Sequence, residues 1–171
     1  MSSPSPREAH RVDALHPFLR RPEAMTITEL LAPDQVLPGL RASTKGAVLE
    51  DLARRSGLAL GLDSDAILAA LRKREALGST GVGNGLAIPH ARLDALGKPF
   101  GCFARLRSPI AFDAVDGGAV DLVFLLLLPA ADGGPLHALA CVSRRLRDPD
   151  VTATVRGARD AAGLYAAICG T

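Results

Sequence analysis

The stretch from Val120 to Leu128 is apolar at every position except Asp121, and Pro129 follows it directly. A run of this length and composition is typical of a strand that is buried on both faces of a sheet. It is much too short for a membrane helix, which requires about 20 apolar residues. The run therefore predicts a central strand in a fold whose helices pack against a sheet.

Capping residues and apolar spacing predict helices on both sides of this run. The expected helices cover residues 44–57 (capped by Ser43 or Thr44 and closed by Gly57), 64–77 (capped by Asp63 or Ser64, with Gly78 as the C-terminal glycine), 136–146, and a last helix capped by Asp160. A short helical turn is expected at 30–31. The expected buried seams are Leu136, Leu139, Val142 and Leu146 in the third helix, which Asp148-Pro149 ends, and Leu164 and Ile168 in the last.

Shorter strands are expected at 36–37, at 86–88 and at 100–106, and the last of these alternates loosely, as a half-exposed strand does. Strands and helices together place the chain in the α/β or α+β class, as a single domain from residue 25 to residue 171. Residues 1–24 contain four prolines among serines and arginines, without periodicity, so we expect them to form a disordered leader.

Charge and cysteine content limit the classes of function. The formal net charge is +2 and the arginines are dispersed without interleaved aromatic residues, so we expect no nucleic-acid or anionic-membrane partner. The three cysteines form no CxxC pair, and each is expected to be a buried, reduced thiol. Because the N-terminus lacks the hydrophobic region of a signal peptide, we expect a cytoplasmic location.

A glycine-rich segment, Gly78–Gly85, leads through three apolar residues into Pro89 and His90. Glycine at this density allows tight turns and close approach to the backbone, and Pro89 ends the short strand before it. His90 is then expected at a strand end, beside a loop rich in N–H groups and hydroxyls that favours anions. From the residues alone, a structural histidine explains the pattern equally well.

Arg74 lies on the same face of the expected 64–77 helix as Ile67 and Leu71. A charge on an apolar stripe is unusual. In the last turn of the helix the side chain can reach past the helix end, toward the glycine-rich segment and His90. An arginine that turns out to solvent, or pairs with an acid, explains the position equally well.

The sequence KREALGSTG at Lys73–Gly81, followed by Ile88-Pro89-His90, resembles the signature of phosphotransferase-system (PTS) enzyme IIA of the fructose/mannitol type, and especially its nitrogen-regulatory branch. The similarity continues at Ser108–Asp116, Val120–Phe124 and Leu136–Pro149, so it covers nearly everything from about Met25 on. The resemblance implies a mixed central β-sheet flanked by α-helices.

The resemblance also implies a phosphoryl carrier. His90 would accept a phosphoryl group from an HPr/NPr-like phosphocarrier protein, itself charged from phosphoenolpyruvate by enzyme I, and Arg74 would stabilise the phosphate. The phosphorylation state would regulate partner proteins, of unknown identity, in nitrogen, potassium or carbon regulation. The expected phosphate-binding loop comprises Ser79, Thr80, Gly81, Gly83 and Asn84. We expect no metal and no organic cofactor.

The chain departs from the family's pattern at a second histidine. The family commonly has His at the start of the helix that here begins Pro135-Leu136-His137, so the usual position is proline. Residues two apart do not share a helix face. His137 reaches the site only if the helix begins differently here, and is otherwise a surface residue.

Two other functions remain open. One is a sugar-specific IIA component that passes phosphate to a separate IIB protein, and the other is a binding module that acts without phosphorylation. A dinucleotide site is disfavoured because the glycines follow a helix and precede a strand, the reverse of the Rossmann order. The four histidines also lack metal-ligand spacing.

Overall fold

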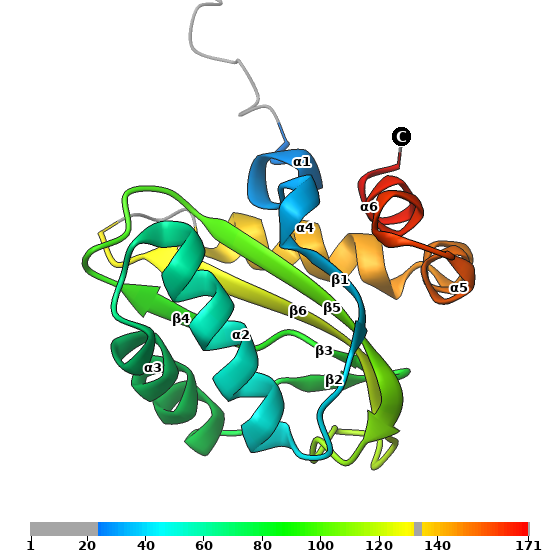
Figure 1. Ribbon diagram of the computed structural model, residues 1–171, viewed down its shortest axis with the longest axis horizontal. Helices are drawn as coiled ribbons and strands as arrows, with labels where there is room; N and C mark the ends of the chain where they lie inside the picture. Colours follow the sequence, from blue (N-terminus) through cyan, green and yellow to red (C-terminus); the bar gives the residue numbers. More distant parts are fainter. Residues whose placement is uncertain (1–23, 132–134, 171) are drawn as a thin grey trace, which may run out of the picture.

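The computed structural model describes residues 24–131 and 135–170, so the expected leader at 1–24 lies outside the described residues, except for its last residue. Figure 1 shows helices on two sides of a sheet. In chain order the elements are α1 (Ile27–Leu30), the 3₁₀ turn η1 (Pro33–Gln35), β1 (Val36–Leu40), α2 (Lys45–Leu60), α3 (Ser64–Ala76), β2 (Gly81–Gly83), β3 (Leu86–Ala87), β4 (His90–Leu93), β5 (Phe100–Ile110), β6 (Val120–Pro129), α4 (Pro135–Arg147), α5 (Pro149–Gly157) and α6 (Ala161–Cys169).

The strands form one six-stranded sheet in the order β1-β5-β6-β3-β2, with β4 also paired to β6. β1 runs parallel to β5, and β5 runs antiparallel to β6. β3 and β4 both run parallel to β6, and β2 runs antiparallel to β3. The sheet is therefore mixed. β6, which has partners on both edges, is the central strand that the apolar run predicts.

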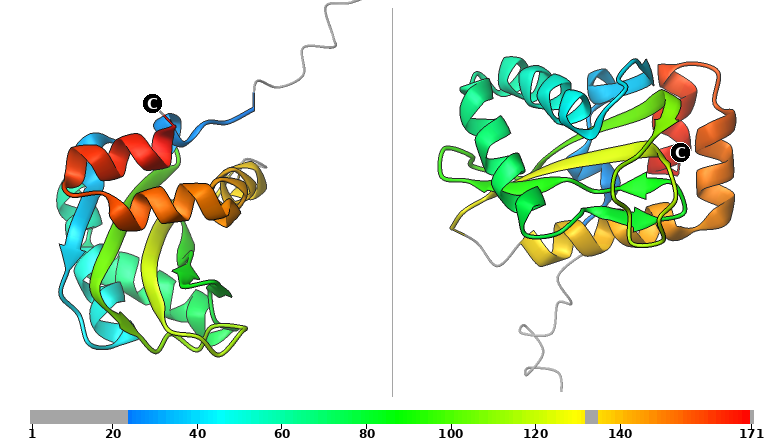
Figure 2. Two further views of the ribbon diagram at one scale, coloured as in Figure 1. Left: turned by 90° about the vertical axis from the view of Figure 1, so that its right-hand side faces the viewer. Right: turned by 90° about the horizontal axis from the view of Figure 1, so that it is seen from below.

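Helices bury both faces of this sheet, so the fold has three layers (Figure 2). One face packs against α2 and α3, and the other against α1, α4, α5 and α6. Alternate residues of β6 enter the two cores: Val123, Leu125 and Leu127 face α2 and α3, whereas Leu122, Phe124, Leu126 and Leu128 face the other helices. Because side chains alternate across a strand, a strand buried on both faces must be apolar almost throughout.

The predicted caps are present, but α2 ends later than expected. Thr44 and Asp160 accept hydrogen bonds from the N–H groups of Ala47 and Gly163, at 3.1 and 2.8 Å. α2 continues through Gly57 to Leu60 and ends at a left-handed glycine, Gly61. Gly57 serves close packing instead, because a Cβ there would lie 2.9 Å from the carbonyl oxygen of Leu62.

β5 is not half exposed as expected. It extends to Ile110, and residues 100–104 are all buried. The alternating residues Phe100, Cys102, Ala104 and Leu106 form one buried face of β5. The opposite face holds Gly101 and the buried ring of Phe103. Gly101 gives no apolar signal, yet a Cβ there would lie 2.8 Å from the carbonyl oxygen of Leu30 in α1. The second face is therefore covered by close backbone approach, which an apolar pattern cannot reveal.

The seam of α4 also differs from the expected one. Ala138, Val142 and Leu146 are buried, whereas Leu136 is 73% exposed. The Asp148-Pro149 pair ends α4, as predicted, and also begins α5, which was not expected. Asp148 accepts the N–H of Asp150 at 2.9 Å, and proline at the first helical position is compatible with a new helix. α6 buries Leu164 and Ile168, as predicted.

The cysteines are free, and they differ in burial. Cys102 is buried in the sheet, and burial raises the pKa of its thiol to about 12. Cys141 and Cys169 are only partly buried. The expectation of a buried thiol therefore holds for Cys102 alone.

Candidate active site

His90 lies where the strand beside β6 is interrupted. β3 pairs with Leu122 and Val123, and β4 pairs with residues 126–129, so Ile88 and Pro89 form a break between two short strands. Proline has no N–H to donate to the ladder. His90 is thus the first residue of a new strand, not the residue after a strand end as expected.

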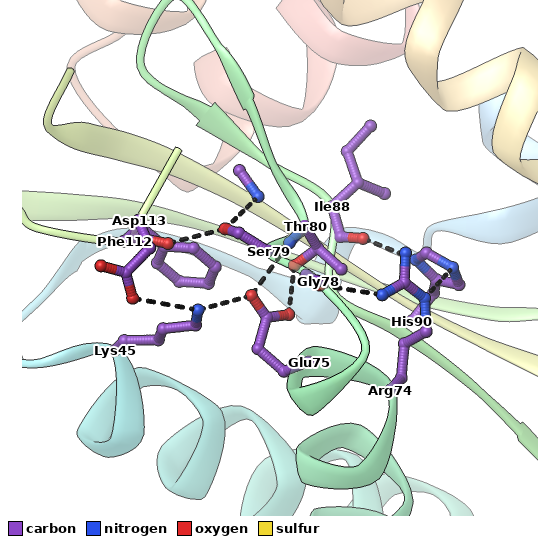
Figure 3. Close-up of polar contacts among 11 residues, drawn as sticks. Lys45, Arg74, Glu75, Gly78, Ser79, Thr80, Ile88, His90, Phe112 and Asp113 are labelled. Atoms are coloured by element: carbon purple, nitrogen blue, oxygen red, sulfur yellow. Dashed lines mark hydrogen bonds and ion pairs between the residues drawn. The ribbon is translucent and has the colours of Figure 1, made fainter. Parts of the chain in front are cut away.

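This break fixes the tautomer of the imidazole. Nδ1 of His90 lies 2.8 Å from the carbonyl oxygen of Ile88. A carbonyl only accepts, so Nδ1 carries the ring proton and Nε2 carries the lone pair. Nε2 accepts a hydrogen bond from Nε of Arg74 at 3.2 Å. The nucleophilic nitrogen therefore faces the guanidinium (Figure 3).

His90 is neutral at neutral pH. Burial is the main cause, and it lowers the pKa of the imidazole below its ordinary value of 6.5. The hydrogen bond to the Ile88 carbonyl raises that pKa, the charge of Arg74 lowers it, and the charge of Glu75 raises it, with burial prevailing. A half-buried neutral ring that carries a lone pair on Nε2 is chemically a nucleophile.

Arg74 reaches past the end of its helix, as one of the two sequence interpretations expected. It belongs to the last turn of α3, and its Nη1 donates to the carbonyl oxygen of Gly78 at 2.9 Å. That second contact holds the planar guanidinium at the edge of the His90 ring (Figure 3). Such a group can bind the oxygens of a phosphate with a pair of parallel hydrogen bonds.

Glu75 and Lys45 form a polar cluster beside this pair that sequence reasoning missed. Glu75 accepts the N–H and the hydroxyl of Thr80, at 2.9 and 2.6 Å. Nζ of Lys45 lies 2.7 Å from the Glu75 carboxylate and 5.0 Å from the centroid of the Phe112 ring. The cluster joins α2 and α3 to the segment that precedes β2. The sequence did hold one signal for a role of Glu75, because this residue follows Arg74 within the KREALGSTG motif.

The glycine-rich segment is a β-hairpin and not an open loop. β2 and β3 are joined by Asn84 and Gly85, whose φ angles of 54° and 77° match a type I′ turn. Gly81 must be a glycine because a Cβ there would lie 2.8 Å from Cα of Ala114. The Asn-Gly pair is a strong hairpin signal, and the hypothesis of a phosphate-binding loop did not take it into account.

The expected phosphate-binding groups are directed into this hairpin and its neighbours. The hydroxyl of Ser79 donates to the Phe112 carbonyl at 2.8 Å and accepts the N–H of Gly81 at 3.1 Å. The N–H of Asn84 donates to Asp116 at 3.0 Å, as does the N–H of Gly118. Gly83, whose φ is 100°, precedes the turn. The structure thus brings Arg74 to His90, but does not bring Ser79, Thr80, Gly81, Gly83 or Asn84 into hydrogen bonds with either.

A hollow of about 480 Å³, which we call the His90 hollow, has His90 in its lining. Its lining includes the cations Lys73, Arg74 and Arg92, and two leucines, Leu77 and Leu136, that are 82% and 73% exposed. His137 is exposed on α4 and does not belong to this lining in the described part of the chain. α4 turns Leu136, not His137, toward the hollow, as expected for neighbours on a helix.

Two further features of the described residues bear on the chemistry. Across residues 24–131 and 135–170, no three His, Cys, Asp or Glu side chains are grouped as metal ligands would be. Over the same ranges, no helix has both the length and the apolar character needed to cross a membrane.

The sequence matches a known family over most of its length. Residues 29–169 match the family described as "Phosphoenolpyruvate-dependent sugar phosphotransferase system, EIIA 2". A nitrogen regulatory protein of Bradyrhizobium diazoefficiens is 46% identical over 145 residues, which cover 84% of this chain and 95% of that protein.

Solved structures agree. The nitrogen regulatory protein IIA-Ntr of Neisseria meningitidis superposes with a TM-score of 0.78 at 30% identity, covering 83% of this chain and 98% of that one. A complex of enzyme IIA-mannitol with phosphorylated enzyme IIB-mannitol from Escherichia coli gives a TM-score of 0.70 at 16% identity, covering 82% and 98%. The second match reflects the fold alone.

Proposed function

The chain belongs to the EIIA type-2 family of the phosphoenolpyruvate-dependent phosphotransferase system, as a homologue of nitrogen regulatory proteins, and on that premise we propose that His90 is its phosphoacceptor. The phosphoryl donor is an HPr/NPr-like phosphocarrier protein, and the acceptor atom is Nε2. The observation that carries this proposal is the hydrogen bond from Nδ1 to the Ile88 carbonyl, which leaves the lone pair on Nε2 facing Arg74.

The transfer needs no proton to be removed from His90. The P–N bond of the donor's phosphohistidine breaks, its electron pair returns to the donor's ring, and the Nε2 lone pair forms the new P–N bond. The Nδ1 proton stays where it is, and the Ile88 carbonyl stabilises the positive charge that develops on the His90 ring. Such reactions depend mainly on positioning and on charge stabilisation.

Arg74 supplies that charge stabilisation. In the free protein its Nε–H donates to the Nε2 lone pair, so this hydrogen bond must be exchanged for one to a phosphate oxygen as the phosphoryl group arrives. The second contact, from Nη1 to Gly78, keeps the guanidinium in place during the exchange. Each charge-assisted hydrogen bond contributes roughly 1.5–3 kcal/mol.

The rim of the His90 hollow suits a protein donor. Leu77 and Leu136, which we call the rim, line this hollow together with its cations and expose large apolar surface. Exposed apolar side chains that surround a charged group are typical of a protein contact surface. A carrier that presents its phosphohistidine between these leucines would bury them and exclude water from the reacting groups.

We assign the regulatory role by homology. The match to nitrogen regulatory proteins favours control of partner proteins by the phosphorylation state of His90 over transfer to a sugar-specific IIB protein. Growth of a deletion strain on fructose or mannitol distinguishes the two, because only loss of a sugar-specific component abolishes it. We also propose that residues 25–171 form the carrier domain. A variant that starts at Met25 should then keep its thermal stability.

The test of the phosphoacceptor is reconstitution of the relay. The protein is incubated with phosphoenolpyruvate, enzyme I and the matching phosphocarrier, and the intact mass is measured with and without acid treatment. We expect one acid-labile phosphate on the wild type and on His137→Ala, and none on His90→Ala. A folded wild type that stays unlabelled beside a fully phosphorylated carrier would instead make the chain a binding module that acts without phosphorylation.

A further inference from the structure

A second hollow, of about 810 Å³, lies at the β1 edge of the sheet and carries an unusual concentration of arginines. We call it the arginine hollow; its basic residues are Arg41, Arg55, Arg105, Arg107 and Arg159. They come from the residue after β1, from α2, from β5 and from the link between α5 and α6. Residues that are far apart in the sequence thus direct positive charge toward one place.

Overall composition does not explain this concentration. The whole chain has 20 basic and 18 acidic side chains, a difference of only 2. Five of those 20 line the arginine hollow, whereas Asp51 is the one acidic residue of its lining in the described part of the chain. Guanidinium groups held together repel one another unless an anion lies between them.

Two of the five arginines already donate hydrogen bonds to other residues of the chain. Arg105 donates to the carbonyl oxygens of Pro38 and Ala158, at 3.0 and 2.6 Å, and so joins β1 to the end of α5. Arg55 donates to Asp51 at 2.8 Å. These contacts hold the side chains of Arg55 and Arg105 in the lining of the hollow without needing a ligand.

The other three arginines are exposed and have no partner in residues 24–131 and 135–170. Neither a hydrogen bond nor an ion pair involves the side chains of Arg41, Arg107 or Arg159 there. Arg41 and Arg107 also line an adjoining hollow of about 750 Å³, to which Ser43 and Ser108 contribute hydroxyls. The available donors therefore extend along a groove.

We propose that the arginine hollow binds a small molecule that carries several linked phosphate groups, such as a nucleoside triphosphate. The planar fork of arginine matches phosphate oxygens, and three forks along a groove match a chain of phosphates better than a single one. The volume falls within the range of roughly 300–1,000 Å³ that is usual for small-molecule sites.

An acidic protein segment fits this place less well. Protein contact surfaces have an apolar centre. The large apolar side chains that are exposed in the described chain are Leu58, Leu77, Val115 and Leu136, and none of them lines the arginine hollow. Leu77 and Leu136 instead line the His90 hollow.

The arginine hollow is separate from the phosphoacceptor. His90 pairs with Leu126, which pairs with Gly101 of β5. Leu106, in the lining of the arginine hollow, lies five residues farther along β5, or about 17 Å at the usual rise of a strand. A ligand bound there would therefore not contact His90, and the proposal does not depend on phosphoryl transfer.

Calorimetric titration of the full chain tests the proposal, with phosphate, pyrophosphate, tripolyphosphate and ATP as probes at an ionic strength of about 0.15 M. Affinity should rise with the number of linked phosphates. Each of Arg41→Gln, Arg107→Gln and Arg159→Gln should weaken tripolyphosphate binding by about threefold to tenfold, and the triple variant by about thirtyfold to a thousandfold if the three effects add in free energy. Arg147→Gln, an exposed arginine outside the hollow, is the matched control and should bind as the wild type does.

Three results would overturn the proposal. The first is the absence of binding by every probe, and the second is full binding by the triple variant. In that second case, loss of binding in Arg74→Ala would assign the phosphates to the His90 hollow instead. The third is tighter binding of polyglutamate than of tripolyphosphate, which would make this surface a contact for an acidic protein. The fold of each variant is checked by thermal unfolding.

Discussion

The two hollows of this chain surround their positive charge in different ways. In the His90 hollow one guanidinium contacts a neutral imidazole, and exposed leucines form the rim. In the arginine hollow three exposed arginines lie together, and none of the exposed leucines of the described chain is present. Both hollows have positively charged side chains that could bind an anion, but only the His90 hollow also has exposed leucines.

This difference is what we expect between a site that receives phosphate from a protein donor and a site that binds a small phosphorylated ligand. A protein donor brings its own binding surface, so the acceptor needs apolar contacts and only one well-placed cation at the reacting atom. A small anionic ligand has little surface to bury, so its binding depends on the number of charge-assisted hydrogen bonds. Mutations in the two hollows should therefore affect different measurements.

Among single changes that keep His90, the largest effect on phosphorylation is expected for Arg74→Ala. Loss of the guanidinium removes charge-assisted hydrogen bonds to the transferring group, so phosphorylation of His90 should slow by about tenfold to a hundredfold. Arg74→Lys should recover only part of this rate, because an ammonium lacks the planar fork. The rate is measured by intact mass with limiting phosphocarrier. Tripolyphosphate binding at the arginine hollow should not change, and a rate within twofold of wild type would contradict the role of Arg74.

Glu75→Gln should lower the stability of the fold. The Glu75 side chain is only 6% exposed, and its loss of charge leaves Lys45 without its nearest partner. We expect the free energy of unfolding to fall by about 1–3 kcal/mol in urea titrations. Glu50→Gln is the control, because the ion pair between Glu50 and Arg72 is more than half exposed and should contribute less than about 1 kcal/mol. Equal losses in the two variants would show that the buried cluster has no special role.

Leu77→Ser and Leu136→Ser should weaken docking without changing the chemistry. If the rim contacts the phosphocarrier, each change should raise KM for the carrier by about threefold to tenfold and leave kcat nearly unchanged. Leu58→Ser is the matched control, since Leu58 is 75% exposed on α2 and lies outside the His90 hollow. If all three variants behave alike, the rim is not a docking surface.

Sequence reasoning anticipated the layers of the fold and the central pair of the site. The apolar run predicted β6, and the position of Arg74 in the last turn of α3 made its approach to His90 one of two good interpretations. Both inferences rest on local periodicity, which a sequence displays directly. The hairpin was missed because glycine fits an anion loop and a tight turn equally well, although Asn84-Gly85 held the signal.

Other features depend on contacts between distant residues and leave no local pattern. The arginine hollow combines residue 41 with residues 55, 105, 107 and 159, which only the folded sheet brings together. The exposure of Leu136 depends on how α4 is rotated against the sheet, and the start of that helix at a proline left its phase uncertain. Glu75 and Lys45 likewise meet only once α2 packs beside α3.

The smallest effect concerns pH, and it tests whether His90 is a nucleophile in its resting state. Burial lowers the pKa of His90 below 6.5, so the ring is mostly neutral at pH 6.5, where an ordinary histidine is half protonated. Protonation at Nε2 removes the lone pair, so the phosphorylation rate falls as the pH drops through the pKa of His90. Between pH 7.5 and 6.5 the rate should therefore fall by less than the about twofold expected of an ordinary histidine.

The imidazole titration of His90, followed by NMR in the unphosphorylated protein, measures this pKa without interference from the donor. In Arg74→Gln the midpoint should rise toward that of an ordinary histidine, because a nearby positive charge is lost while burial remains. The arginines of the arginine hollow stay charged over the same interval, so any change in tripolyphosphate binding there should follow only the titration of the ligand's own terminal phosphates. A midpoint above 6.5 in the wild type would contradict the lowered pKa, and a midpoint above neutral pH would mean that His90 rests as an imidazolium whose Nε2 has no lone pair to offer the donor.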